Sequence, residues 1–438
     1  MASSRNQRPI LLVDGKEDDE MLDAIFKHFE VEHPEAEANA VVINLDDGKE
    51  LKIELELKCS QMDGKVIRMA QGRIGAFCVQ CSRTREQAHK PEVIAAGMDV
   101  NLSTAEINAT YEKFKSDDEN DTKIVTRNFS VEVRGGQTQK PKTVTVEVAT
   151  ILPPLHAKLR CETWGVDMMV RFCCGRTIYL ERNETKKEEY LQVQRNFRKN
   201  SKMICGFPLL QTDGDTGTTA DEFFEYENRE RVLKLLDLYA PAKPVNATRQ
   251  QMEPYKKRMA EIEQFKNTWR KVLQNLSVIT TIINGDYLVN VEAFDEFCIQ
   301  TALMIREEVE WVWFAPTVHQ VLAHAAEAIK DNDSRGLLNQ SEQGSEASHK
   351  KIKHLRLKAA RQISLNANLA DVFNTCWIDS DFQLRSYDRT PTCSHCSTEG
   401  HWTRSCPKKH PKNKTKTPDE EIIERLTYDD GDTEDKED

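Results

Sequence analysis

Cysteine and histidine residues near the C-terminus have the spacing of zinc ligands. The segment CSHCSTEGHWTRSC follows the pattern C-x2-C-x4-H-x4-C, with a glycine directly before the histidine. Two thiolates, an imidazole and a third thiolate at this spacing suit one tetrahedral zinc ion. The predicted ligands are Cys393, Cys396, His401 and Cys406.

This predicted zinc knuckle has the surroundings of a nucleic-acid-binding module. Trp402 follows the histidine ligand, where its ring can stack on a base, and Lys408 and Lys409 can contact phosphates. Such knuckles commonly bind single-stranded nucleic acid. A zinc-stabilised protein–protein module is the alternative.

A second possible zinc site is divided between distant parts of the chain. Cys78 and Cys81 form a C-x2-C pair, and His319 and His324 form an H-x4-H pair on an expected helix marked by Pro316. The histidine pair alone is a weaker signal than the cysteine pair, because two histidines on one helix are more often surface or core residues, but together the pairs supply the four ligands of a Cys2His2 site. Such a site would hold the early part of the chain against a distant helical region.

Two acidic residues are candidates for phosphodiester chemistry. Asp63 follows an alternating strand pattern and precedes a glycine, where a divalent-metal nuclease can place a ligand, although the local pattern by itself favours an ordinary turn. Glu346 precedes a strongly basic helix that could hold a nucleic-acid strand, or could simply be a solvated face. The basic residues singled out on this helix are Lys350, Lys351, Lys353 and Arg356.

The elements that must position these residues are mostly helices. Apolar periodicity predicts helices over 185–199, 221–238, 253–276 and 291–308. Strands are predicted over 40–45 and 51–57, joined by the turn sequence Asp-Asp-Gly-Lys. Residues 332–348 are polar and predict a loop. The other cysteines are predicted to be small buried hydrophobes: Cys59, Cys161, Cys173, Cys174, Cys205, Cys298 and Cys376.

Bulk composition is that of a soluble protein with several domains. Of 438 residues, 30% are charged and 39% are hydrophobic, and no apolar run approaches the roughly 20 residues of a membrane span. Twelve cysteines without a secretory signal favour metal ligands and free thiols. The net charge of −11 comes largely from residues 418–438, with eleven acidic and two basic residues, which predict a disordered acidic tail.

The order of these motifs resembles the catalytic core of the RAG recombinase large subunit and the related Transib transposases. The matching segments are MDGK at 62–65, GAFCVQCSRTR at 75–85, PLH at 154–156, LLDLYAPAKP at 235–244, PTVHQVLAH at 316–324, and SE at 345–346 followed by HK at 349–350. The resemblance covers residues 8 to 365 approximately, and the C-terminal knuckle points to an invertebrate or transposon-borne member.

The resemblance implies an α+β, predominantly helical fold. A partial RNase H-like core of the DDE transposase type would be interrupted by a large helical zinc-binding insertion. The implied domains are a partial RNase H-like sheet at 1–70, the helical insertion with the split Cys2His2 site at 71–330, and the catalytic-glutamate loop and basic helical domain at 331–385. The residues themselves, beyond the resemblance, predict the CCHC zinc knuckle with its basic flank at 386–417 and the acidic tail at 418–438.

The resemblance also implies an activity. Asp63 and Glu346 match two of three carboxylates that bind Mg²⁺ or Mn²⁺, with Glu342 as a neighbouring competitor to Glu346. Such enzymes cleave and transesterify DNA at inverted-repeat or recombination-signal-like ends. They act in the nucleus as homodimers, usually with a kelch-propeller accessory subunit and without a membrane.

The first catalytic aspartate of the family is expected upstream of the residues that match here. Asp14, at the end of an apolar strand, could replace it by position, but the resemblance places a non-catalytic loop there. We therefore expect this chain alone not to cleave DNA. The competing hypothesis is a non-enzymatic zinc-knuckle nucleic-acid-binding protein, such as a retroelement capsid–nucleocapsid chain or a domesticated remnant.

Overall fold

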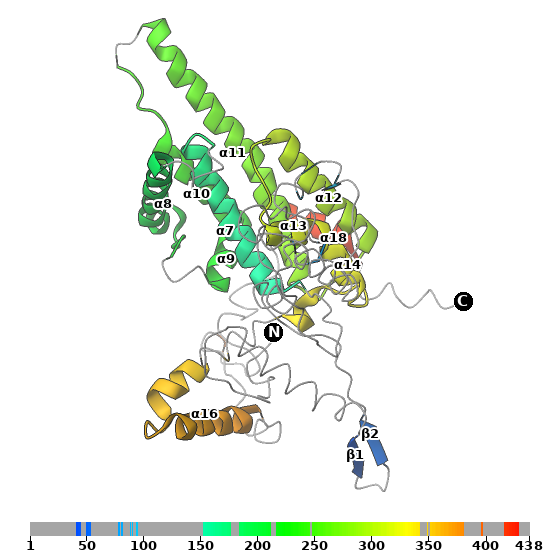
Figure 1. The fold of residues 1–438 in the computed structure, drawn as a ribbon. Coiled ribbons are helices and arrows are strands. Elements are labelled where there is room, and N and C mark those ends of the chain that lie inside the picture. Colours follow the sequence, from blue (N-terminus) through cyan, green and yellow to red (C-terminus); the bar gives the residue numbers. More distant parts are fainter. Residues whose placement is uncertain are drawn as a thin grey trace, which may run out of the picture. The chain divides into compact units, whose positions relative to one another are not determined.

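The computed structural model describes residues 41–44, 50–53, 78, 80–81, 88, 90, 93–94, 152–176, 184–211, 216–245, 248–341, 348, 351–380, 396 and 416–428. The chain divides into two compact units, one comprising Met1–Gly15 and Ser341–Glu424 and the other comprising Lys16–Gln340 and Arg425–Asp438. The described part is mostly helical with little sheet, as the sequence predicts (Figure 1). Among the described helices, none combines the length and apolar character needed to span a membrane.

Helices α7 (Pro154–Cys173) and α11 (Arg249–Ile283) form the centre of the larger unit. Their aromatic side chains interlock: Trp164 lies 5.5 Å from Trp269 between ring centroids, and Phe172 stacks on Phe265 at 4.1 Å. Offset and tilted aromatic pairs of this kind stabilise a core beyond their buried area. Helix α11 is buried mainly from Ile262 onward, and its N-terminal half extends away from the other helices of this unit (Figure 1).

Helices α12 (Val291–Glu308), α13 (Pro316–Ala323) and α14 (Ala325–Lys330) pack together against this centre. Helix α12 begins at Asn290, whose side chain accepts a hydrogen bond from the backbone N–H of Ala293. It matches the predicted helix over 291–308. Helix α13 begins with Pro316 at its first position, where a missing N–H costs nothing.

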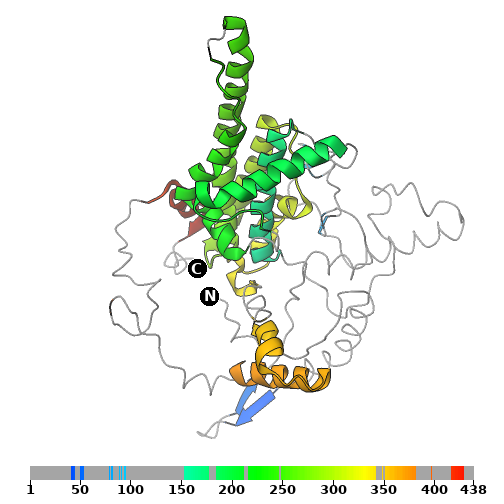
Figure 2. The ribbon, with the colours of Figure 1, turned by 90° about the vertical axis from the view of Figure 1, so that its left-hand side faces the viewer.

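A second helical layer contains α8 (Glu184–Cys205), α9 (Gly217–Phe224), α10 (Tyr226–Leu233) and the 3₁₀ helix η3 (Lys234–Tyr239). Helix α8 directs Val193, Phe197, Ser201 and Cys205 inward, and it packs on α7, α10 and η3 (Figure 2). The predicted helix over 221–238 is therefore three shorter elements. The break falls at Glu225, whose extended backbone separates α9 from α10.

The described sheets are short. Strands β1 (Val41–Asn44) and β2 (Glu50–Ile53) pair antiparallel, with Val41 opposite Ile53, as the predicted hairpin requires. Strands β3 (Leu288–Val289) and β4 (Thr427–Tyr428) form a second antiparallel pair. The RNase H-like core stays a prediction, because most of residues 1–70 lie outside the described part.

The prediction of a disordered tail at 418–438 is wrong for its first half. Helix α18 (Pro418–Leu426) leads into β4, and the backbone N–H of Asn290 donates to the carbonyl of Leu426 at 2.9 Å. The acidic composition concealed a capping box, in which Thr417 and Glu420 each accept from the other's backbone N–H. Acidic residues in the first turn also suit the positive end of the helix dipole.

The predicted loop over 332–348 is also partly wrong. Residues 332–334 form a turn, Arg335 bridges to Leu288, and the 3₁₀ helix η4 (Leu337–Gln340) buries Leu337 completely. The side-chain amide of Asn332 donates to the carbonyls of Arg335 and Gly336, so polar residues here hold a compact turn together. At Gly336 a Cβ atom would lie 2.4 Å from the carbonyl oxygen of Ile282, which explains the glycine.

The smaller unit contains a helical turn at 351–354, the π-helix η5 (Leu355–Ala359) and α16 (Leu365–Ser380). Ala360, Val372 and Cys376 form its described core, with Ile352 and Leu355 packed against them. The carboxylate of Asp371 accepts from the backbone N–H and the guanidinium of Arg361, which links η5 to α16.

Candidate metal centre

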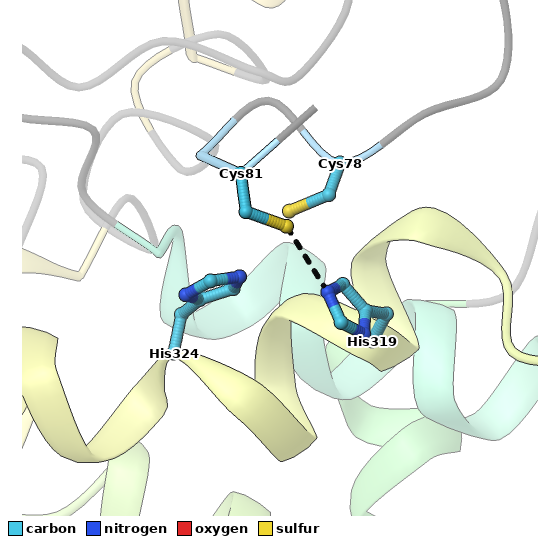
Figure 3. A group of neighbouring side chains, drawn as sticks. All are labelled: Cys78, Cys81, His319 and His324. Carbon is cyan, nitrogen blue, oxygen red and sulfur yellow. Dashed lines mark hydrogen bonds between the residues drawn. The ribbon is translucent and has the colours of Figure 1, made fainter. Parts of the chain in front are cut away.

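The four ligands predicted for the split zinc site come from three places in the larger unit. Cys78 and Cys81 lie in and beside a turn, His319 lies on α13, and His324 lies between α13 and α14 (Figure 3). The structure brings all four side chains together, although 238 residues separate Cys81 from His319.

A break in the helix allows both histidines to face the cysteines. On a continuous α-helix, residues five positions apart point about 140° away from one another. The structure corrects the expectation of one helix carrying both histidines: α13 ends at Ala323, and His324 has a non-helical backbone with φ −127° and ψ −3°. This break redirects the second imidazole toward the pair of thiols.

The ligand atoms form a compact group. All four lie within 4.8 Å of one another, and the Sγ atom of Cys81 lies 3.3 Å from Nε2 of His319. The two imidazole rings are 5.3 Å apart between centroids and are inclined at 84°, so they approach the same point from different directions. A tetrahedral zinc ion, with ligand distances of about 2.0–2.3 Å, needs donor atoms this close together.

Burial of these four metal-donor side chains costs folding free energy when no metal ion is bound. Cys78, His319 and His324 are 1%, 4% and 1% exposed. In the described part of the chain, neither ring nitrogen of His324 has a hydrogen-bond partner. A buried polar group without a partner costs about 1–3 kcal/mol. Coordination of a metal ion would remove this cost.

The two thiols differ in their acidity. Burial raises the pKa of Cys78, and its hydrogen bond to Cys81 adds to the rise. The same hydrogen bond lowers the pKa of Cys81, and the nearby imidazoles lower it further. One thiol is therefore prepared as a thiolate, the form in which cysteine binds metals. The second thiol would lose its proton when the metal enters.

This donor set fits a structural metal centre. Two thiolates and two imidazoles fill all four positions of a tetrahedral zinc ion and leave none open for a substrate. The group could therefore bind a metal such as zinc and would fix the turn at 78–81 to the start of α14. Its chemistry favours support of the fold over catalysis.

Contacts around α13 include residues that the sequence did not single out. Trp164 donates from its indole N–H to the carbonyl of Trp313 at 2.8 Å, and Arg306 donates to the carbonyls of Glu310 and Val312. These bonds fix the segment that leads into Pro316. The cluster of tryptophans at 311–313 was a visible signal of a core segment, whereas nothing in the pattern marked Arg306.

The other predicted site residues are only partly described. Of the knuckle ligands, Cys396 alone is described; it is half-buried and lies in a turn. Lys351 forms an ion pair with Asp379, and Lys353 and Arg356 line a cavity of about 580 Å³ in the smaller unit. Those outside the described residues are Asp63, Glu346, Lys350, Cys393, His401, Trp402, Cys406, Lys408 and Lys409.

The single cysteines are mostly as expected. Cys161, Cys174, Cys205, Cys298 and Cys376 are buried and unbridged. Cys173 differs slightly, because it is only half-buried.

Fold and site together define a mostly helical protein with a buried Cys2His2 group that could hold a metal ion. No family model matches this chain, and no curated protein matches it either.

Proposed function

We propose that this chain carries catalytic residues of a RAG-like DNA recombinase or transposase. The observation that carries the proposal is the meeting of Cys78 and Cys81 with His319 and His324. The resemblance implies this particular pairing of distant motifs. A capsid-type protein gives no reason for the first pair to need the second.

The proposed activity is cleavage and transesterification of DNA at inverted-repeat ends. Asp63 and Glu346 would hold Mg²⁺ or Mn²⁺, which would supply Lewis-acid assistance to phosphodiester displacement. Lys353 and Arg356 would hold the strand through its phosphates, and the predicted knuckle would hold flanking or target DNA. The proposal includes a nuclear homodimer with a kelch-propeller partner.

A nicking assay tests the catalytic part of the proposal. The chain is incubated with inverted-repeat duplexes and Mg²⁺ or Mn²⁺, alone and with a second polypeptide that supplies a third catalytic aspartate, since only Asp63 and Glu346 match the family's carboxylates here. We expect no nicking by the chain alone. Robust nicking that Asp14→Ala abolishes would show that Asp14 completes the site and that the expected incomplete triad is wrong.

Metal content tests the structural part and separates the two hypotheses. We expect two zinc ions per chain, of which one is lost in Cys78→Ala and the other in Cys393→Ser. A single zinc ion that persists in Cys78→Ala and disappears in Cys393→Ser would favour the non-enzymatic zinc-knuckle protein.

A further inference from the structure

The C-terminal half of α8 is basic and has no acidic residue to balance it. The sequence from Tyr190 to Gln211 contains no aspartate or glutamate. Within this stretch lie four cations that we call the α8 basic face: Arg195, Arg198, Lys199 and Lys202.

These four residues lie on one side of the helix. Their spacing is i, i+3, i+4 and i+7, which places side chains along a single stripe. All four are exposed, whereas Val193, Phe197 and Ser201 on the other side are buried. Helix α8 also lies at the outside of its unit (Figure 1), and the exposure of the four cations shows that the stripe faces away from the buried side.

Pairing distinguishes the two halves of α8. In the N-terminal half, Lys186 pairs with Glu189 at 2.6 Å and Lys187 pairs with Glu184 at 3.7 Å. In the basic face, Arg195 reaches back to Glu188 at 2.5 Å, with both side chains more than half exposed. Such exposed pairs contribute little energy and exchange readily.

The other three cations of the face have no ion pair within the part of the chain that the structure describes: Arg198, Lys199 and Lys202. Arg231 of α10 adds a fifth positive charge at the end of α8. Its guanidinium would lie 3.7 Å from a Cβ atom at Gly206, directly after the helix.

The helix dipole explains only some of the cations in the α8 basic face. Cations favour the negative C-terminal end of a helix, but the effect is confined to the last turn. Lys202 lies in that turn, whereas Arg195 and Arg198 lie well before it. An exposed row of four cations, of which only Arg195 has an ion pair in the described structure, in a chain of net charge −11 requires a separate reason.

We propose that the α8 basic face binds the phosphate backbone of DNA. Arg195 and Lys202 are seven residues apart, about 10.5 Å along the helix axis. Phosphates of one strand follow one another at about 3.4 Å along the duplex axis, so the stripe spans about three of them. This inference rests on the proposed function and adds a DNA contact on the helical insertion, separate from the knuckle and from the helix at 351–356.

Two matched double variants of the full chain test the proposal. Lys199→Gln/Lys202→Gln removes two unpaired cations from the face. Lys186→Gln/Lys187→Gln removes two ion-paired cations from the same helix and changes the net charge equally. Circular dichroism and zinc content of both variants must equal those of the wild type, so that a change in binding is not a change in folding.

Binding is measured by fluorescence anisotropy on a labelled 30-base-pair duplex across a salt series. For Lys199→Gln/Lys202→Gln we expect weaker binding. We also expect the slope of log K against log salt to be smaller by about 1.8, because each lost phosphate contact removes about 0.9. For the control variant, Lys186→Gln/Lys187→Gln, we expect the same slope as for the wild type.

The outcomes separate the inference from the proposed function. If the wild type binds the duplex and both variants keep its slope, the α8 proposal is wrong and the proposed function stands. If Lys186→Gln/Lys187→Gln lowers the slope as much as Lys199→Gln/Lys202→Gln, the change in net charge alone explains the effect and the α8 proposal is again wrong. If the wild-type chain binds no duplex at any salt concentration, the proposed function fails together with this inference.

Discussion

His324 is the residue on which the metal centre depends most directly. Both of its ring nitrogens are buried without a partner in the described structure, so it gains most from coordination. We expect His324→Ala to remove one metal ion per chain, because three remaining ligands and an apolar gap cannot close a tetrahedral site. Inductively coupled plasma mass spectrometry measures the metal content.

A cysteine outside the cluster provides the control for this measurement. Cys173 is a half-buried thiol on α7, and burial raises its pKa, so it stays protonated at neutral pH. We expect Cys173→Ser to retain the full metal content. Loss of metal in both variants would indicate general unfolding, and loss in neither would exclude His324 as a ligand.

Trp164 connects the core to the segment before the metal-binding helix. Its indole donates to the carbonyl of Trp313, and its ring packs against Trp269 and Phe314. We expect Trp164→Phe to destabilise the protein by about 1–3 kcal/mol, since the carbonyl is left buried without a donor. Thermal unfolding measures the loss. An unchanged midpoint would mean that the bond contributes nothing.

At the scale of elements, the C-terminal strand β4 is part of the larger unit. Removal of α18 and β4 would take away the pairing of β4 with β3 and the buried side chain of Leu426, whose burial is worth about 2 kcal/mol. We expect truncation after Lys416 to lower the unfolding midpoint. Truncation after Tyr428 removes only the mostly acidic residues 429–438 and serves as the control, with an expected midpoint equal to that of the full chain. Equal effects of both truncations would contradict the structural role of β4.

The ion pair between Arg361 and Asp371 makes the smaller unit sensitive to acid. Hydrogen bonds from the Arg361 side chain and backbone lower the pKa of Asp371 from its usual 3.8 to about 2. A lowered folded-state pKa stabilises the unit above pH 3.8, and this contribution disappears as the pH falls from 3.8 to about 2.

Hydrogen exchange can measure this contribution locally. At pH 6 we expect Asp371→Asn to speed the exchange of amides near Ala360 and Asn368 relative to the wild type. Near pH 2 we expect the two proteins to exchange alike after correction for intrinsic rates. A difference that persists at pH 2 would mean that the asparagine disturbs packing instead of removing a charge.

The sequence predicted elements best where a pattern was strong and local. The helix at 291–308 and the hairpin before residue 57 follow directly from periodicity and turn residues. The division of 221–238 at Glu225 and the break at His324 could not be predicted, because both depend on packing against distant helices. Composition misled at 418–426, where acidic residues indicated disorder but an unnoticed Thr417–Glu420 capping box begins a helix.

For the candidate metal site, the sequence predicted which residues could be ligands but not how their side chains are arranged in space. The spacing of Cys78 with Cys81 and the resemblance together identified the four candidate ligands. Their convergence depends on tertiary contacts such as those of Arg306 and Trp164, which no local pattern contains.

At the scale of the whole molecule, the Cys2His2 group that could hold a metal joins segments far apart in the chain. A metal that binds only the folded state stabilises it according to its concentration relative to its dissociation constant, by about 4 kcal/mol at a thousandfold excess. We expect 1,10-phenanthroline to lower the unfolding midpoint of the wild type by about 5–10 °C. Differential scanning fluorimetry measures this shift.

The control for chelation is a protein that already lacks the centre. In Cys78→Ser/His319→Ala we expect a low midpoint that the chelator changes little. A large further decrease in this variant would show that another metal site, such as the predicted knuckle, carries most of the stabilisation.

The distance between Cys81 and His319 in the sequence also means that the ribosome synthesises the cysteines well before the histidines. Cells add about 5–20 residues per second, so the histidines emerge some 10–50 s after the cysteines. During this interval Cys81 waits without the imidazoles that lower its pKa, and Cys78 waits without its buried surroundings. The nascent thiols are then open to oxidation or to capture of the wrong metal, and correct loading depends on how quickly the ribosome delivers α13.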